Sequence, residues 1–135
     1  VWNYELFPPD AVREAQRAGA DSIAYTYSDP VVFYEYVRDS AELAREEGLS
    51  NVLVTAGYIN PAPRADFFAH LDAANIDLKS FDDQTYRSEC LARLAPVLDT
   101  RRNGVCIRHH GSLSGWVALH SCGESEIFHP SAHLR

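Results

Sequence analysis

The chain has 135 residues, enough for one small domain or for part of a larger one. Hydrophobic residues make up 46% and charged residues 23%, and no run approaches the roughly 18 apolar residues of a membrane span, so no membrane association is expected. A net charge of -7 with a single lysine argues against nucleic-acid binding, which needs clustered basic side chains.

The two ends of the chain differ in composition. Residues 1–5 are not a signal peptide, so we expect a cytoplasmic protein. The sequence has no methionine, which indicates a cut N-terminus. Residues 1–100 hold 17 of the 19 acidic residues, whereas residues 101–135 hold five of the six histidines. We therefore predict a structured part, 1–100, and an atypical tail, 101–135, that is frame-shifted or disordered.

Two helices are predicted in the first fifty residues. The first begins near Pro8, because proline suits the first turn and Asp10 complements the positive end of the helix dipole. Gly19 is expected to end it. Apolar residues at helical spacing predict the second over 31–47, with Gly48 as its end.

Three strands alternate with these helices. Aromatic and β-branched content predicts a strand over 22–27, and a near-continuous apolar run predicts a buried strand over 51–55. A third strand is expected over 75–79, and further helices over 66–71 and from Asp82 onward. The gap between successive strands is long enough for a crossover helix. Such a βαβαβ series predicts an α/β fold with a parallel sheet and right-handed connections.

Polar and charged residues follow each predicted strand. In parallel α/β sheets ligands bind at the carboxyl ends of the strands, so these residues are expected to meet at one edge. The candidate site residues are Thr26, Ser28, Asp29, Thr55, Gly57, Asp77 and Lys79.

Each main candidate also has a purely structural interpretation. Asp29 before Pro30 is a typical helix N-cap, and Gly57 is typical of a turn. Asp77 and Lys79 face the same side of a strand, where an ion pair between them would satisfy both charges. The sequence leaves these interpretations open beside a binding site.

Three segments occur in an order and spacing that resemble a known family. They are S-I-A-Y-T-Y-S-D-P over 22–30, V-T-A-G-Y-I over 54–59 and I-D-L-K over 76–79. They are similar to radical S-adenosylmethionine (SAM) enzymes of the pyruvate formate-lyase activating enzyme type, most of all the AmmeMemoRadiSam-system branch. The resemblance covers about residues 3–100 and implies an incomplete, partial (βα) barrel with parallel strands.

The resemblance implies roles for residues after the first two strands. Segment 26–30 corresponds to the stretch where backbone and an acidic side chain receive the amino group of SAM, and Asp29 would be that acid. Asp29 stands where the family usually has Glu, but its carboxylate still pairs with an ammonium. Thr55 and Gly57 would lie near the sugar or methionyl part, whereas Ala56 replaces a usual Asn and puts that contact in doubt.

The third motif implies roles for two charged residues at the carboxylate of SAM. Asp77 and Lys79 match the family's Asp-Leu-Lys motif. Lys79 would interact with the SAM carboxylate, and Asp77 would orient the lysine or help to bind a cation.

The cluster-binding cysteines of the family are missing. Its members hold a 4Fe-4S cluster through C-x3-C-x2-C, and the cluster cleaves SAM to a 5′-deoxyadenosyl radical. Residues 2–6 match the sequence after the third cysteine, so Val1 stands at that cysteine's position. We expect this chain to bind no cluster and to be inactive alone. The substrate is unknown, and the resemblance only suggests a protein.

The tail permits other interpretations. Residues 101–135 do not continue the family's pattern, which suggests a shift of reading frame. A zinc cluster is an alternative, because sulfur and imidazole suit zinc, although the spacing fits no standard template. Its ligands would be Cys106, His109, His110, His120 and Cys122.

Two rival hypotheses concern the whole chain. A non-catalytic α/β module that binds a small ligand would explain the parallel sheet and the charges, but not the three ordered motifs. A fragment too incomplete to fold well is the other, since exposed strand edges favour association. Hydrolase, dinucleotide-binding and P-loop motifs are absent from the sequence.

Overall fold

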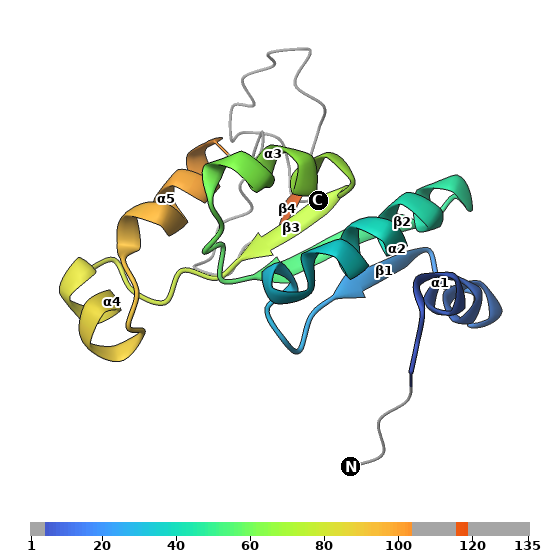
Figure 1. The fold of residues 1–135 in the computed structure, drawn as a ribbon, viewed down its shortest axis with the longest axis horizontal. Helices are drawn as coiled ribbons and strands as arrows, with labels where there is room; N and C mark the ends of the chain where they lie inside the picture. The colour runs from blue at the N-terminus through green and yellow to red at the C-terminus, as the bar shows by residue number, and fades with distance from the viewer. Residues whose placement is uncertain (1–4, 104–115, 119–135) are drawn as a thin grey trace, which may run out of the picture.

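The structure is a computed structural model that describes residues 5–103 and the short strand at 116–118 (Figure 1). Helices and strands alternate through its first three-quarters, as the sequence predicts. In chain order the elements are α1 Pro8–Arg17, β1 Ser22–Tyr25, η1 Pro30–Phe33, α2 Tyr34–Glu46, β2 Ser50–Thr55, α3 Pro61–Ala69, β3 Ala73–Ile76, α4 Asp83–Glu89, α5 Leu94–Asn103 and β4 Trp116–Ala118.

Strands β1, β2 and β3 form the parallel sheet that the sequence predicts. Ser22 pairs with Ser50 and Val52 with Ala73, so β2 is the middle strand of the three. Strand β4 adds to β3 in the antiparallel direction. The described part is therefore a mixed α/β structure with a small open sheet, and a closed barrel is not seen in it.

The predicted strand ends need correction. Strand β1 ends at Tyr25 rather than at residue 27, because the backbone of Tyr27 turns to a φ of 69°. Strand β3 covers Ala73–Ile76 rather than 75–79. The amide of Asp77 still donates to the Thr55 carbonyl at 2.8 Å, but the chain then leaves the ladder. Asp77 and Lys79 thus lie just beyond the strand.

Helix boundaries also differ from the predictions. The segment predicted as one helix over 31–47 begins as the 3-10 turn η1 and continues as α2. Helix α3 spans Pro61–Ala69 rather than 66–71, because proline is compatible with the first turn of a helix. Helix α5 continues to Asn103, three residues beyond the boundary predicted at 100.

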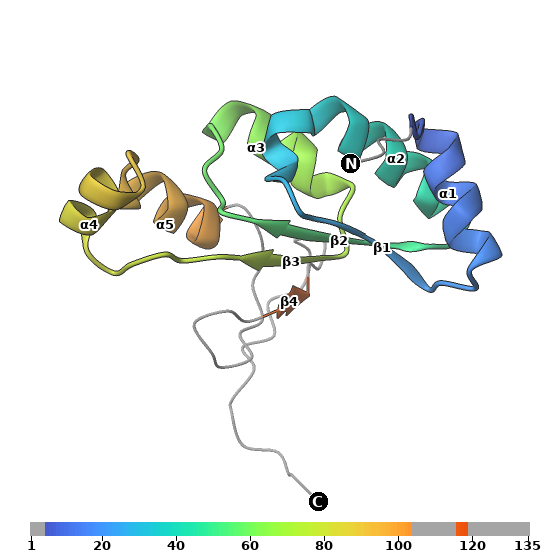
Figure 2. The same ribbon diagram turned by 90° about the horizontal axis from the view of Figure 1, so that it is seen from below.

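Helices α1, α2 and α3 cover one face of the sheet (Figure 2). The core between them is apolar, and its fully buried side chains include Val37, Leu53 and Phe67. Strand residues alternate in burial, with Leu53 and Thr55 toward the helices and Val52 and Val54 partly exposed on the opposite face. Helices α4 and α5 lie beyond the carboxyl ends of the strands (Figure 2).

Among the described helices, none is long and apolar enough to cross a membrane.

Candidate functional site

The carboxyl edge of the sheet brings Asp29 and the end of β2 together. The Thr55 hydroxyl donates to Asp29 Oδ1 at 2.7 Å, and the Ala56 amide donates to Oδ2 at 3.0 Å. The Val31 amide donates to Oδ1 at 3.2 Å, which makes Asp29 the N-cap of η1. The structural interpretation of Asp29 is therefore confirmed, and the carboxylate additionally joins two neighbouring strand ends.

The three donors leave room on the Asp29 carboxylate for a ligand. A carboxylate has about four acceptor positions. Oδ1 accepts two of the three bonds and Oδ2 one, and the described residues supply no further donor. The half-buried side chain is thus fixed in position with one acceptor position remaining on Oδ2.

Gly57 continues this arrangement at the end of β2. Its amide donates to Thr55 Oγ1 at 3.0 Å, so Thr55 links Gly57 to Asp29. Gly57 has a φ of 72°, and a Cβ there would lie 2.6 Å from Ile76 Cγ2. Both facts require glycine for reasons within the protein. A role of Gly57 in admitting a ligand stays a prediction.

Asp77 and Lys79 lie at the same edge, after β3. Lys79 Nζ is 2.9 Å from Asp77 Oδ2, as the structural interpretation of this pair predicts. Asn75 Nδ2 donates to Asp77 Oδ1 at 3.1 Å. About half of the Lys79 side chain is exposed, so a negatively charged ligand has access to its ammonium group.

Thr26 and Ser28 follow β1 near this edge without side-chain hydrogen bonds to other described residues. Thr26 is partly buried and Ser28 exposed. Tyr27 between them is fully exposed, and its φ of 69° is unusual for a bulky residue. The structure thus brings Asp29, Thr55 and Gly57 into one hydrogen-bonded group and leaves Thr26 and Ser28 outside it.

Several residues that the sequence did not indicate support this edge. The Lys79 amide donates to the hydroxyl of buried Tyr86 at 3.0 Å, which fixes the backbone at the lysine. Asn75 Oδ1 is buried and has no partner among the described residues, so a ligand donor would satisfy it. The sequence carries no signal for Tyr86, because its contact with Lys79 depends on how α4 packs near the end of β3. Asn75 stands out only by its position two residues before Asp77.

Helix α5 packs against the site through α3. Buried Arg64 of α3 lies 2.6 Å from Asp99 Oδ2 and 3.5 Å from Thr100 Oγ1. A Cβ at Gly57 would lie 3.6 Å from Thr100 Cγ2. A buried arginine therefore holds α5 next to the turn at Gly57.

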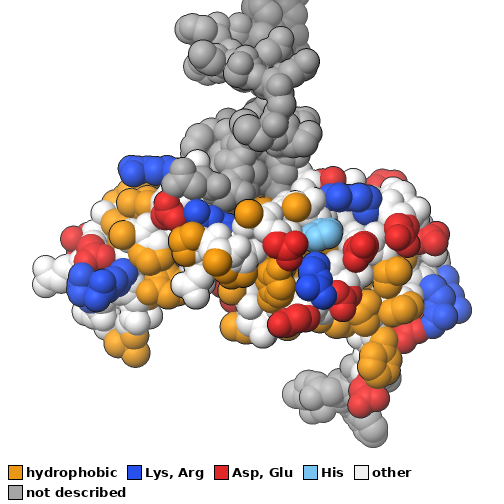
Figure 3. All heavy atoms as spheres, turned by 45° about the horizontal axis from the view of Figure 1, so that its top comes forward, with side chains coloured by type: hydrophobic (Ala, Val, Ile, Leu, Met, Phe, Trp, Pro, Cys, Tyr) orange, Lys and Arg blue, Asp and Glu red, His pale blue; other side chains and the backbone are white. Residues whose placement is uncertain are grey.

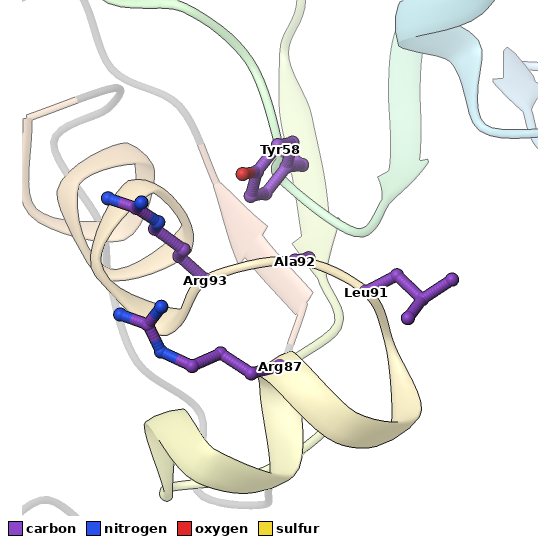
Figure 4. Close-up of a pocket in the computed structure, with 5 residues that line it drawn as sticks. All are labelled: Tyr58, Arg87, Leu91, Ala92 and Arg93. Carbon is purple, nitrogen blue, oxygen red and sulfur yellow. The ribbon is translucent and has the colours of Figure 1, made fainter.

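A pocket opens beside this edge, next to Tyr58. It is lined by Tyr58, Arg87, Leu91, Ala92 and Arg93 (Figure 4). On the face shown in Figure 3, acidic and basic side chains alternate, and the basic ones form no continuous patch. The two arginines of the pocket are therefore a local feature of an otherwise acidic protein.

The described residues do not provide a metal centre. No group of three or more His, Cys, Asp or Glu side chains within residues 5–103 could hold a metal ion. Among the described residues the cysteine is Cys90, which is exposed and unpaired, whereas a 4Fe-4S cluster held through C-x3-C-x2-C needs three thiolates. The residues proposed for zinc, and Val1, lie outside the described part of the chain.

Comparison with known proteins shows similarity to an archaeal protein. The chain is 42% identical over 96 residues to the uncharacterized protein MJ0808 of Methanocaldococcus jannaschii. The match covers 71% of this chain but only 28% of the relative. No protein-family model matches the chain.

Proposed function

We propose that this chain carries the SAM-binding part of a radical SAM protein. The observation that supports the proposal most is the position of Asp29. Three protein donors hold its carboxylate where β1 and β2 end, and one acceptor position remains on Oδ2. A fixed, half-buried carboxylate is suited to a ligand ammonium, because a charge-assisted hydrogen bond gains most when its acceptor is already in place.

Lys79 would bind the other charged group of the ligand. Its ammonium pairs with Asp77, which Asn75 holds in turn, so the side chain is oriented before a ligand binds. The carboxylate of SAM would share this ammonium with Asp77. Asp29 and Lys79 would then bind the two charged groups of the methionyl end, and Thr55 would keep Asp29 in place.

A titration with SAM tests the binding. We expect saturable heat of binding to the chain, and we expect Lys79→Gln to weaken it about tenfold, because a hydrogen bond to a charged group is lost. Lys79 is half exposed, so its substitution leaves the fold intact, which a circular dichroism spectrum checks. Asp29→Asn should abolish the binding, since Asn offers the ammonium no negative charge.

Asp39→Asn is the matched control for Asp29→Asn. Asp39 is an exposed carboxylate on α2 that pairs with Arg38 at the surface, so its loss should not change the affinity for SAM. Absence of SAM binding to the unsubstituted chain, or equal affinities for the Lys79→Gln and Asp39→Asn variants, would contradict the proposal.

Binding without reaction is the second candidate function. It is favoured by the cysteines of the sequence, because Cys90, Cys106 and Cys122 do not have the C-x3-C-x2-C spacing that the cluster of the family needs. Treatment with iron and sulfide should therefore leave this chain colourless and unable to cleave SAM. The same treatment of the longer M. jannaschii relative tests whether the larger protein cleaves SAM. A brown, SAM-cleaving relative supports the radical SAM proposal, whereas a colourless one favours the binding module.

A further inference from the structure

The pocket at Tyr58 has a volume of about 340 Å³ and lies where α4 turns into α5. Arg87 comes from α4, whereas Leu91, Ala92 and Arg93 form the connection between the two helices. Tyr58 directly follows the turn at Gly57. No candidate residue for SAM binding lines the pocket, so the pocket is distinct from the proposed SAM site.

The two arginines of the pocket differ in their partners. Arg87 donates from Nε to Asp83 Oδ2 at 2.7 Å, which orients the guanidinium and leaves its two Nη groups for other acceptors. Arg93 forms no ion pair with the described residues, although its positive charge helps to lower the pKa of the nearby Asp83, after the hydrogen bonds from Leu94 and Arg87. In Figure 4 both guanidinium groups extend to the same side of the connection, and the Tyr58 hydroxyl points toward that side.

Hydrogen bonds fix the connection that carries these residues. The Ala92 amide donates to the Tyr86 carbonyl at 3.0 Å, and the Leu94 amide donates to Asp83 Oδ1 at 2.9 Å. Leu91 has a φ of 50° and is almost fully exposed. A bulky residue in this conformation is strained, and such strain persists only where the surroundings fix the backbone. The arginines are thus held on a shaped, preorganised loop.

We propose that this pocket binds the phosphate group of a small phosphorylated molecule. Arginine presents paired N–H donors that match phosphate oxygens, and two guanidinium groups with a phenol hydroxyl can serve three oxygens of one tetrahedral anion. A carboxylate has only two oxygens for these donors. Leu91 and Ala92 supply an apolar wall for the organic part of the ligand.

Phenyl phosphate, inorganic phosphate and benzoate are the probes that test this site on the full chain. In NMR titrations we expect phenyl phosphate to cause saturable shifts of the Arg87 and Arg93 side-chain signals. Arg93→Gln should weaken the binding about tenfold, because it removes charge-assisted hydrogen bonds without touching an ion pair. Tyr58→Phe should weaken it by a smaller factor. Inorganic phosphate should bind at the same residues and benzoate much more weakly.

Arg17→Gln is the matched control, since Arg17 is an exposed arginine on α1 that lies outside the pocket. It should leave the affinity unchanged. Shifts that do not saturate, equal affinities of the Arg93→Gln and unsubstituted proteins, or benzoate binding as tight as that of phenyl phosphate would each overturn the proposal. Asp29→Asn should not affect phosphate binding, so failure here is distinguishable from failure of the SAM proposal.

Discussion

Gly57 and Gly48 have similar backbone conformations but different surroundings. Their φ angles are 72° and 78°. A Cβ at Gly48 would meet nothing within 4 Å, whereas a Cβ at Gly57 would lie 2.6 Å from Ile76 Cγ2. Alanine substitutions at the two positions therefore distinguish the cost of a left-handed backbone from the added cost of a steric clash.

We expect Gly57→Ala to lower the free energy of unfolding more than Gly48→Ala does. Both substitutions place a Cβ in a left-handed conformation, at a cost of about 1 kcal/mol. Gly57→Ala additionally forces Ile76 to move, which should add about 1–3 kcal/mol. Urea denaturation of the two variants measures the difference. Equal losses would mean that the turn at Gly57 adjusts and that its contact with β3 is not important for stability.

Candidate site residues could be found from the sequence because polar residues after buried strands stand out. Asp29, Thr55 and Lys79 were identified in this way. The pairing of Lys79 with Asp77 was predictable from their spacing along one strand. The bond between Thr55 and Asp29 was not, because the two residues lie 26 positions apart in the chain. Tyr86 and Arg64 gave no signal at all, since a tyrosine and an arginine on helices are ordinary surface residues until packing buries them.

Helices α4 and α5 depend on two neighbouring carboxylates. Asp82 is the N-cap of α4 and accepts from the Thr85 amide at 2.7 Å. Asp83 accepts from the Leu94 amide, where α5 begins, and pairs with Arg87. The Thr85 backbone bond lowers the pKa of Asp82. The Leu94 backbone bond, followed by the Arg87 bond, lowers the pKa of Asp83.

Stability of the α4–α5 unit should therefore decrease in acid. Because the folded pKa values lie below the ordinary value of 3.8, both carboxylates stabilise the fold fully above that pH and lose this effect as the pH falls through the folded values. Carbon-detected NMR of the carboxyl groups measures the two pKa values directly.

Asp83→Asn should remove part of this acid sensitivity, and Asp39→Asn, at the exposed carboxylate on α2, serves as the comparison. Amide exchange at Leu94 should become faster in the Asp83→Asn variant. Midpoints of titration at or above 3.8 for both carboxylates would contradict the prediction, because the backbone bonds would then contribute nothing to the ionised forms.

At the scale of the whole molecule, β1 occupies one edge of the sheet. One side of β1 pairs with β2, and no described strand pairs with the opposite side. Open strand edges favour pairing with another chain, and β1 carries no charged side chain that would prevent it. We therefore expect the protein to associate as its concentration rises.

Ala24→Lys should reduce this association by placing a charge on the exposed face of β1. Sedimentation velocity over a concentration series measures the effect. Val32→Lys is the control, because Val32 is an exposed apolar residue on η1, outside the sheet. Association that responds to Val32→Lys as strongly as to Ala24→Lys would show that general hydrophobicity, rather than the strand edge, drives it.

The sequence by itself determined the alternation of helices and strands, the parallel direction of the first three strands and the edge of the sheet where polar residues gather. These features follow from hydrophobic periodicity, glycine and proline positions and the handedness of crossover connections, all of which are local or general. Tertiary structure alone decided which groups meet at that edge. Asp29 joins β2, Tyr86 supports Lys79, and two arginines line a pocket with Tyr58, because these contacts depend on packing between elements distant in the chain.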